Sequence, residues 1–329
     1  MLQTENLRYK TVVITGASSG IGHGAAVAFA KEGANLVLAA RNKEALYAVA
    51  EECKKFGVKA LVVVTDVTDP EAVQYLADKA YREYGRIDVW VNDAGVGAVG
   101  TYEEVPFESH KQVVAVNLVG YMNGIHTVLP YFKKQKFGTI INMNSLGAYF
   151  PSPYAASYTA SKYGLRGFTE AVRAELRKWP DIHVCDVVPA FVNSPGMKHG
   201  ANYTGVEMKP VPPAVRAHTV ARKIVAVAKN PKPTTMVGLT AKLGRIIGPH
   251  APALFAGFMA GLMEKHIQNG KKTEITDGNL FKPTPKSSAQ IEGSYHRVAK
   301  TTAVVGGIAT IGLLAWKFSQ HHQTENRIQ

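Results

Sequence analysis

Short apolar segments rich in valine and isoleucine alternate along this chain with longer segments whose apolar residues recur at helical spacing. Continuous apolar strands are typical of parallel sheets, because both faces of such a sheet are covered. Parallel strands need long crossover connections, and the intervening segments are long enough to supply them as helices. The pattern therefore predicts an α/β fold with a doubly wound parallel sheet.

The predicted elements define one main domain. Predicted strands cover Thr11–Thr15, Leu36–Ala39, Leu61–Thr65, Val89–Val91, Thr139–Met143, His183–Val188 and Thr235–Leu239. Predicted helices cover Ala25–Lys31, Lys43–Phe56, Glu71–Tyr84, Tyr158–Arg177 and Ala214–Lys229. We expect a main domain over residues 1–240, a C-terminal extension over 241–300, and a candidate membrane-anchor helix with a polar tail over 301–329.

Composition places the chain among ordinary globular enzymes, with 46% hydrophobic and 19% charged residues. The 2 cysteines cannot form a disulfide framework, and the polar N-terminus carries no secretory signal pattern, so we expect a cytoplasmic catalytic domain. Lys and Arg number 38 against 25 acidic residues, a net charge of +13. Acids and bases intermix without an arginine-rich arm, so no nucleic-acid partner is predicted. No metal site is predicted either.

A glycine-rich turn follows the first predicted strand and opens into a helix of small residues. Its members are Thr15, Gly16, Ala17, Ser18, Ser19, Gly20, Ile21 and Gly22. Glycines at such a turn let backbone N–H groups approach a pyrophosphate at the positive end of the helix dipole. A tight turn without a ligand uses the same residue types, but the position between strand and helix favours a dinucleotide.

The end of the second strand indicates which dinucleotide is bound. In such folds an acid at this point binds the ribose 2′-hydroxyl of NAD. Here Ala39 and Ala40 carry no carboxylate and Arg41 follows, so a 2′-phosphate would find a charge-assisted contact. The sequence therefore favours NADP(H). The alternative is that Arg41 caps a strand end in solvent.

Tyr158 and Lys162 lie at positions i and i+4 of a predicted helix and so share a face. A fixed ammonium beside a phenol stabilises the phenolate and is expected to lower the pKa of Tyr158 from about 10 toward the working range of an acid–base catalyst.

The same spacing occurs at Tyr75 and Lys79, and context separates the two pairs. Ser145 lies thirteen residues before Tyr158, just past a strand and thus at the carboxyl end of the sheet, where open α/β folds bind ligands. The residue at that offset from Tyr75 is Val62, inside a strand. We expect Tyr75 to be a packing residue.

Taken together and in order, these motifs resemble those of the short-chain dehydrogenase/reductase family, over approximately residues 8 to 240. The resemblance implies a Rossmann fold and assigns further cofactor-binding residues beyond the turn and Arg41. These are Asp66, which matches the family's adenine-contacting acid, Asn92, Ala94 and Gly95 of its N-N-A-G element, and Pro189, Val192 and Ser194 after the sixth strand. The family's catalytic tetrad corresponds to Asn117, Ser145, Tyr158 and Lys162.

What the resemblance implies is hydride exchange between the nicotinamide and a carbonyl or alcohol carbon. Tyr158 would act as general acid, and Ser145 would hydrogen-bond the developing oxyanion. Lys162 would lower the pKa of Tyr158 and bind the nicotinamide ribose. Asn117 would hold a water that connects Lys162 to solvent.

The chain departs from the family's pattern at a few positions. Asp93 replaces the second Asn of N-N-A-G, and Ala190 stands where a glycine is usual. Ser194 takes the place of a threonine but still offers a hydroxyl. These departures bear on cofactor affinity more than on the chemistry.

The substrate side is apolar. Candidates for its lining are Leu146, Tyr149, Phe150 and Tyr154, and a substrate loop over 195–213 that contains Met197, Tyr203 and Met208. The alternative is that the aromatic residues only fill the core. We expect an apolar carbonyl or secondary alcohol as the substrate.

Two apolar segments follow the main domain. Ile246–Met263 is interrupted by Pro249 and Pro252 and resembles an interfacial or dimer-packing helix. The uncharged segment 301–316 is a candidate membrane anchor, with the alternative that it packs on protein. Basic residues before it would keep the catalytic domain cytoplasmic; they are Lys282, Lys286, Arg297 and Lys300. A homo-oligomer is expected from the resemblance. Alternative functions are a non-catalytic dinucleotide sensor and a membrane-associated scaffold.

Overall fold

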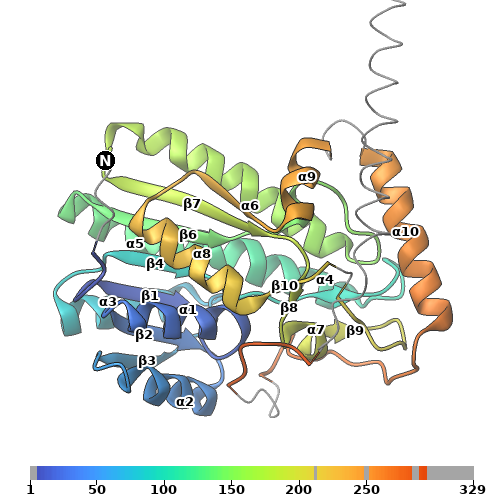
Figure 1. Ribbon diagram of the computed structural model, residues 1–329, viewed down its shortest axis with the longest axis horizontal. Coiled ribbons are helices and arrows are strands. Elements are labelled where there is room, and N and C mark those ends of the chain that lie inside the picture. The colour runs from blue at the N-terminus through green and yellow to red at the C-terminus, as the bar shows by residue number, and fades with distance from the viewer. Residues whose placement is uncertain (1–5, 211–212, 248–251, 284–288, 295–329) are drawn as a thin grey trace, which may run out of the picture.

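A parallel sheet forms the centre of the structure, a computed structural model that describes residues 6–210, 213–247, 252–283 and 289–294. Its seven strands follow the order β11-β7-β6-β4-β1-β2-β3, and every neighbouring pair is parallel (Figure 1). The strands are β1 (Thr11–Thr15), β2 (Asn35–Ala40), β3 (Ala60–Val64), β4 (Val89–Asn92), β6 (Gly138–Met143), β7 (Ile182–Pro189) and β11 (Thr234–Val237). The predicted doubly wound parallel sheet is confirmed.

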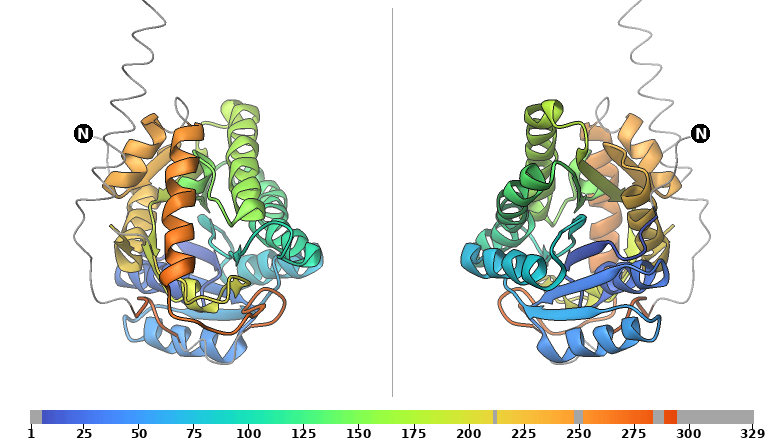
Figure 2. Two further views of the ribbon diagram at one scale, coloured as in Figure 1. Left: turned by 90° about the vertical axis from the view of Figure 1, so that its right-hand side faces the viewer. Right: turned by 90° about the vertical axis from the view of Figure 1, so that its left-hand side faces the viewer.

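Helices cover both faces of this sheet, as the two side views of Figure 2 show. One face packs against α1 (Gly20–Lys31), α2 (Lys43–Lys54) and α8 (Ala217–Lys229). The other packs against α3 (Pro70–Tyr84), α4 (Phe107–Val114), α5 (Gly120–Gln135) and α6 (Ala156–Glu175). Successive side chains of a strand alternate between the two cores: Val12 and Ile14 join the first, and Val13 joins the second. This double burial explains why the strands are continuously apolar.

One long helical segment was not among the predicted elements. Residues 107–135 form α4, a π-helical turn over Ala115–Val119, and α5 in succession. This segment alone among the described helices has the length and mean hydropathy, 1.2, of a membrane span, but half of it is buried against the sheet. It is therefore a core helix. Gly120, Gly124 and Pro130 obscure its helical pattern in the sequence.

The C-terminal extension packs on the carboxyl end of the sheet. Here α9 (Leu239–Ile247) and α10 (Pro252–Asn269) replace the single interrupted helix suggested by the sequence. Met259 of α10 shares a small apolar core with Phe150 and Val188 of the main domain. The helix expected to be interfacial or dimer-packing therefore packs on its own chain. The candidate anchor over 301–316 lies outside the described residues.

Candidate active site

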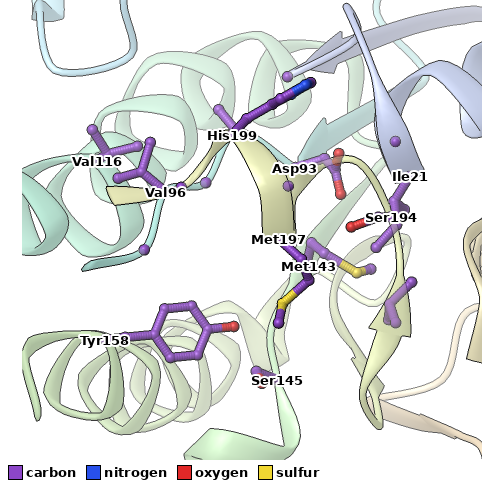
Figure 3. Close-up of a pocket in the computed structure, with 18 of the residues that line it drawn as sticks. Ile21, Asp93, Val96, Val116, Met143, Ser145, Tyr158, Ser194, Met197 and His199 are labelled. Carbon is purple, nitrogen blue, oxygen red and sulfur yellow. The ribbon is translucent and has the colours of Figure 1, made fainter. Parts of the chain in front are cut away.

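A cavity of about 480 Å³ opens at the carboxyl end of the sheet, where β1, β2, β4, β6 and β7 end (Figure 3). Most of the residues that the sequence predicts for the site line it. They are Gly16, Ser18, Ser19, Gly20, Ile21, Arg41, Asp66, Ala94, Gly95, Ser145, Tyr158, Lys162, Pro189, Val192 and Ser194. Segments separated by more than a hundred residues in the sequence thus meet in one site, as parallel strand topology requires.

Four of the predicted site residues do not line the cavity: Thr15, Gly22, Asn92 and Asn117. The Thr15 hydroxyl oxygen accepts the backbone N–H of Asp93 at 3.2 Å. The Asn92 amide is buried within the sheet, where it donates to Asn142 Oδ1 at 2.9 Å and accepts from an indole N–H. The side chains of Thr15 and Asn92 thus hold the strand ends together, and their part in cofactor binding remains a prediction.

The glycine turn fits a bound pyrophosphate. Gly16 has φ of +73°, and a Cβ there would lie 2.7 Å from the backbone nitrogen of Ala94. A Cβ on Gly22 would lie 2.4 Å from the Gly16 carbonyl oxygen. Only glycine lets the turn pack this closely. Ser19, the N-cap of α1, makes no side-chain cap hydrogen bond, so the N-terminus of α1 faces the cavity without a capping side chain, a setting that suits an anion.

Tyr158 and Lys162 project from the first turns of α6 toward the cavity. The hydroxyl of Tyr158 points into the cavity in Figure 3. Lys162 is only 4% exposed, and its Nζ donates to the carbonyl oxygen of Met143 at 2.9 Å. The same nitrogen lies 5.8 Å from the centre of the Tyr158 ring and 4.8 Å from that of Tyr121. The predicted phenol and ammonium are brought together, with the ammonium bonded to the end of β6.

The pKa of Tyr158 is raised by burial, an effect that its hydrogen bond with the Ser145 side chain opposes. The net shift is therefore opposite to the expected fall toward the working range of an acid–base catalyst. Burial also lowers the pKa of Lys162, to about 8, against the attraction of Asp93 and Asp186. At neutral pH the phenol is therefore protonated and the amine is mostly charged.

Ser145 follows β6 and begins a short 3₁₀ turn, Leu146–Ala148. Its Oγ accepts the backbone N–H of Gly147 at 3.1 Å, which fixes the side chain. A Cβ on Gly147 would lie 3.4 Å from the Tyr158 ring, so the turn packs closely against the phenol. The two hydroxyl groups reach the cavity from different elements and meet there.

Asn117 lies in the π-helical turn and is fully buried. Its side-chain amide accepts from the backbone N–H of Val96 at 2.9 Å and donates to the Val96 carbonyl at 2.8 Å. This pair of bonds holds the loop after β4 against the cavity. The side chain thus positions that loop, and the expected water relay remains a prediction.

Asp93 takes a role that the sequence analysis missed. Its carboxylate accepts the backbone N–H of Gly22 and thereby ties the loop after β4 to the glycine turn. Burial raises the pKa of Asp93, and the nearby charge of Lys162 opposes that rise. The only signal in the sequence was an acid in the place of the family's second Asn.

Arg41 lines the cavity, but its guanidinium is held by the C-terminal extension. It donates to the carbonyl oxygens of Leu280 and Phe281, both at 3.2 Å, and to that of Asn279 at 2.5 Å. The alternative of a strand cap in solvent is wrong. A contact across some 240 positions leaves no local signal in the sequence.

Part of the cavity lining is apolar, and it includes some of the residues expected on the substrate side. Leu146, Phe150, Met197 and Met208 line the cavity, whereas Tyr149, Tyr154 and Tyr203 do not. Met259 and Met263 of α10 complete this wall and were not predicted. Flexible methionines give an apolar wall that adapts to the shape of a ligand.

Tyr75 and Lys79 repeat the spacing of Tyr158 and Lys162 without the setting. Tyr75 is 52% exposed, and the Lys79 Nζ lies 5.3 Å from the centre of its ring. Neither residue lines the cavity. Tyr75, expected to be a packing residue, instead contacts Lys79 at the surface, and neither residue belongs to the candidate site.

Known proteins are similar to this chain in sequence and in fold. A family model described as short chain dehydrogenase matches residues 10–203. The uncharacterized oxidoreductase YxnA of Bacillus subtilis (strain 168) is 30% identical, over 96% of this chain and 92% of that protein. The 11-beta-hydroxysteroid dehydrogenase A of Sesamum indicum is 36% identical, over 68% of this chain and 67% of that protein. A solved alcohol dehydrogenase from the archaeon Thermococcus sibiricus, complexed with 5-hydroxy-NADP, has a TM-score of 0.62 at 27% identity, over 70% of this chain and 96% of that one.

Proposed function

The chain belongs to the short chain dehydrogenase family of oxidoreductases, and from this premise we propose that it is an NADPH-dependent reductase of apolar carbonyl compounds. The reverse reaction is oxidation of the corresponding secondary alcohol. When bound, the cofactor supplies the hydride at nicotinamide C4. The observation that carries the proposal is that the Tyr158 phenol and the Ser145 hydroxyl meet in one cavity, which the glycine turn also lines.

In this proposal Tyr158 is the general acid. Its hydroxyl donates the proton to the carbonyl oxygen of the substrate, while the Ser145 hydroxyl donates a hydrogen bond to the same oxygen as negative charge develops. Burial raises the pKa of Tyr158, so at neutral pH the phenol is in the protonated form that reduction requires. Oxidation needs the phenolate and is expected to speed up as the pH rises toward that pKa.

Lys162 orients the reacting end of the site. Its ammonium, held by the Met143 carbonyl, lies close enough to stabilise a phenolate once Tyr158 has given up its proton. The charge also suits hydrogen bonds to the nicotinamide ribose. Asn117 holds the loop that faces this end.

Residues at the end of β2 support NADPH over NADH. Arg41 lines the cavity there, and Ala39 and Ala40 carry no carboxylate that would bind a ribose 2′-hydroxyl. A guanidinium has five N–H donors, so the three bonds to backbone carbonyls leave others for a 2′-phosphate. The solved alcohol dehydrogenase with bound 5-hydroxy-NADP is consistent with this choice.

The wall of leucine, phenylalanine and methionine side chains supports an apolar substrate. A spectrophotometric screen of NADPH oxidation by the full chain, across steroid, retinoid, fatty-acyl and quinone carbonyls, tests the proposal. We expect at least one class to be reduced, with Tyr158→Phe inactive toward it. Failure of the folded protein to bind either dinucleotide, or equal turnover by Tyr158→Phe, would overturn the proposal. Assembly into a homo-oligomer and membrane attachment through 301–316 remain predictions.

A further inference from the structure

The segment after α10, residues 270–283, runs back from the end of that helix along the lower edge of the fold in Figure 1, and we call it the belt. Two of its residues, Asn279 and Pro283, line the cavity. Backbone hydrogen bonds join it to the predicted substrate loop. Asn202 and Thr276 exchange two of them, at 2.8 and 3.0 Å, and the Glu207 N–H donates to the Lys271 carbonyl at 2.8 Å. The belt is therefore an ordered wall of the molecule and not a loose tail.

The belt is fixed most firmly beside the cofactor end of the cavity. Leu280 is fully buried in the core that contains Tyr203. The Tyr203 hydroxyl donates to the Asp277 carboxylate at 2.6 Å. The backbone N–H of Asn279 donates to the His199 carbonyl at 2.7 Å. These contacts fix residues 277–280 from both sides.

From this position the belt holds Arg41. Three consecutive belt carbonyls, those of Asn279, Leu280 and Phe281, accept from the two terminal nitrogens of the guanidinium. Gln112 also donates to the Leu280 carbonyl, at 3.4 Å. Because Arg41 directly follows β2, these bonds fix a long and otherwise flexible side chain at the end of that strand.

Several buried polar atoms of the described residues lack a hydrogen-bond partner, and among them the Asn279 side chain belongs to a residue that lines the cavity. Asn279 lines the cavity, and its Oδ1 is buried with no hydrogen-bond partner within the described part of the chain. A buried amide oxygen left without a partner costs free energy, so native structures rarely keep one unless a ligand or water supplies the partner. The protein offers this group at the edge of a cavity that is built for a ligand.

The position of Asn279 identifies which part of the ligand it faces. Its carbonyl is bonded to Arg41 at the end of β2, whereas Ser145 and Tyr158 follow β6. Two strands, β1 and β4, lie between β2 and β6 in the sheet. Asn279 is therefore at the far end of the cavity from the reacting groups, on the side of the adenosine.

We propose that Asn279 is a further cofactor-binding residue, which hydrogen-bonds the adenosine half of the dinucleotide, and that the belt carbonyls position Arg41 beside it. The inference rests on the proposed function. The amide carries both a donor and an acceptor, and adenine presents an amino group beside a ring nitrogen that match them. The C-terminal extension thus contributes directly to a site that the sequence analysis placed within residues 1–240.

Dissociation constants measured by calorimetry test this for NADPH, NADH, 2′,5′-ADP and reduced nicotinamide mononucleotide, which lacks adenosine. Asn279→Ala is expected to weaken the three adenosine ligands by roughly 3- to 10-fold, the size of one neutral hydrogen bond, and to leave the mononucleotide unchanged. The matched control is Asn269→Ala, at the exposed end of α10, where the amide donates to a helix carbonyl. Equal affinities of Asn279→Ala and wild type for all four ligands would overturn the inference.

Hydrogen exchange on the unmodified chain gives an independent readout. We expect 2′,5′-ADP to slow exchange of the amides of residues 279–281, and the mononucleotide to leave them unchanged. Unchanged exchange with saturating 2′,5′-ADP would contradict a contact with the belt. If the wild-type protein binds neither dinucleotide, the proposed function itself fails; if it binds NADPH but Asn279 has no effect, only the inference about Asn279 fails.

Discussion

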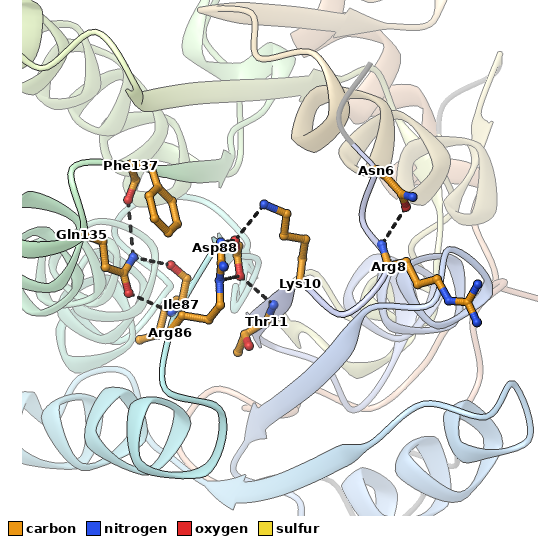
Figure 4. A network of polar contacts seen from close by, with 9 residues as sticks. All are labelled: Asn6, Arg8, Lys10, Thr11, Arg86, Ile87, Asp88, Gln135 and Phe137. Carbon is orange, nitrogen blue, oxygen red and sulfur yellow. Dashed lines mark hydrogen bonds and ion pairs between the residues drawn. The ribbon is translucent and has the colours of Figure 1, made fainter. Parts of the chain in front are cut away.

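Strand β4 carries a carboxylate at each end, and the two have opposite surroundings. Asp88, just before the strand, accepts from the Thr11 backbone N–H at 2.9 Å and from two Arg86 nitrogens at 2.8 and 2.5 Å, with the Lys10 Nζ at 3.3 Å (Figure 4). Asp93, just after the strand, accepts one backbone N–H, and the charge of the buried Lys162 acts on it. An aspartate thus has several hydrogen-bond and ion-pair partners at one end of the strand and few at the other.

The difference distinguishes an aspartate that stabilises the sheet from one that lines the candidate active site. At the amino end of the sheet, the Asp88 carboxylate is hydrogen-bonded to Thr11 and Arg86, and these bonds join β1 to β4. At the carboxyl end, Asp93 and Tyr158 are partly buried, Lys162 is buried, all three line a cavity, and their pKa values are shifted. Perturbed groups of this kind in a cleft are typical of catalytic sites.

The largest effect is expected for Tyr158→Phe at the carboxyl end. Loss of the general acid should lower turnover by roughly 10²- to 10⁴-fold while the fold stays intact. Steady-state NADPH oxidation and circular dichroism are the measurements. Tyr75→Phe is the matched control, with the same spacing to a lysine on the surface, and should retain wild-type turnover. Equal losses in both variants would break the distinction.

Asp88→Ala is expected to show the reverse pattern. The substitution leaves the Thr11 N–H and the Arg86 guanidinium without their partner, at a cost of about 3 kcal/mol in the free energy of unfolding. Urea denaturation measures the loss. The dissociation constant of NADPH should stay within 2-fold of wild type, roughly the effect of less than 0.5 kcal/mol. A variant of full stability, or one with a selective loss of cofactor binding, would contradict a purely supporting role.

Arg41→Ala tests the adenosine end of the cavity. A charge-assisted contact with the 2′-phosphate is worth roughly a 10- to 100-fold change in affinity, so NADPH binding should weaken by that factor. NADH lacks the phosphate and should be affected much less. Binding titrations with both cofactors give the ratio, and equal weakening of the two would remove the case for NADPH.

The smallest effect is expected for Asp93→Asn and appears in the pH dependence. Burial lowers the pKa of Lys162 to about 8, and the negative charge of Asp93 opposes that fall. Removing the charge should lower the Lys162 pKa further, so the activity that depends on the ammonium is lost at lower pH. We expect the alkaline limb of kcat/KM to move down by on the order of one pH unit. An unmoved limb would show that Asp93 does not act on Lys162.

The sequence was sufficient where the signals are local. The strands of the sheet are continuous apolar runs, and Tyr158 and Lys162 lie one helical turn apart, so both were predictable. Helix α1 begins at Gly20, whereas the sequence predicted a start at Ala25. The predicted start was late because the glycines in the first turns disfavour a helix unless packing compensates. The helices within 107–135 were not predicted for the same reason, because Gly120, Gly124 and Pro130 also disfavour a helix.

The remaining features depend on contacts between distant parts of the chain. The bond of Arg41 to the belt joins residues some 240 positions apart, and no local pattern announces it. The upward shift in the pKa of Tyr158 arises from burial under several elements, which the spacing of two residues does not report. Met259 of α10 lines the cavity, although the sequence suggested an interfacial or dimer-packing helix there.

The most direct measurement is a single-turnover stopped-flow experiment with enzyme, NADPH and the best carbonyl substrate of the screen. Cofactor fluorescence follows binding and absorbance at 340 nm follows hydride transfer in the same sample. We predict that Tyr158→Phe keeps the binding phase of the wild type and loses the oxidation phase. An oxidation phase at the wild-type rate in the folded variant would show that another group donates the proton.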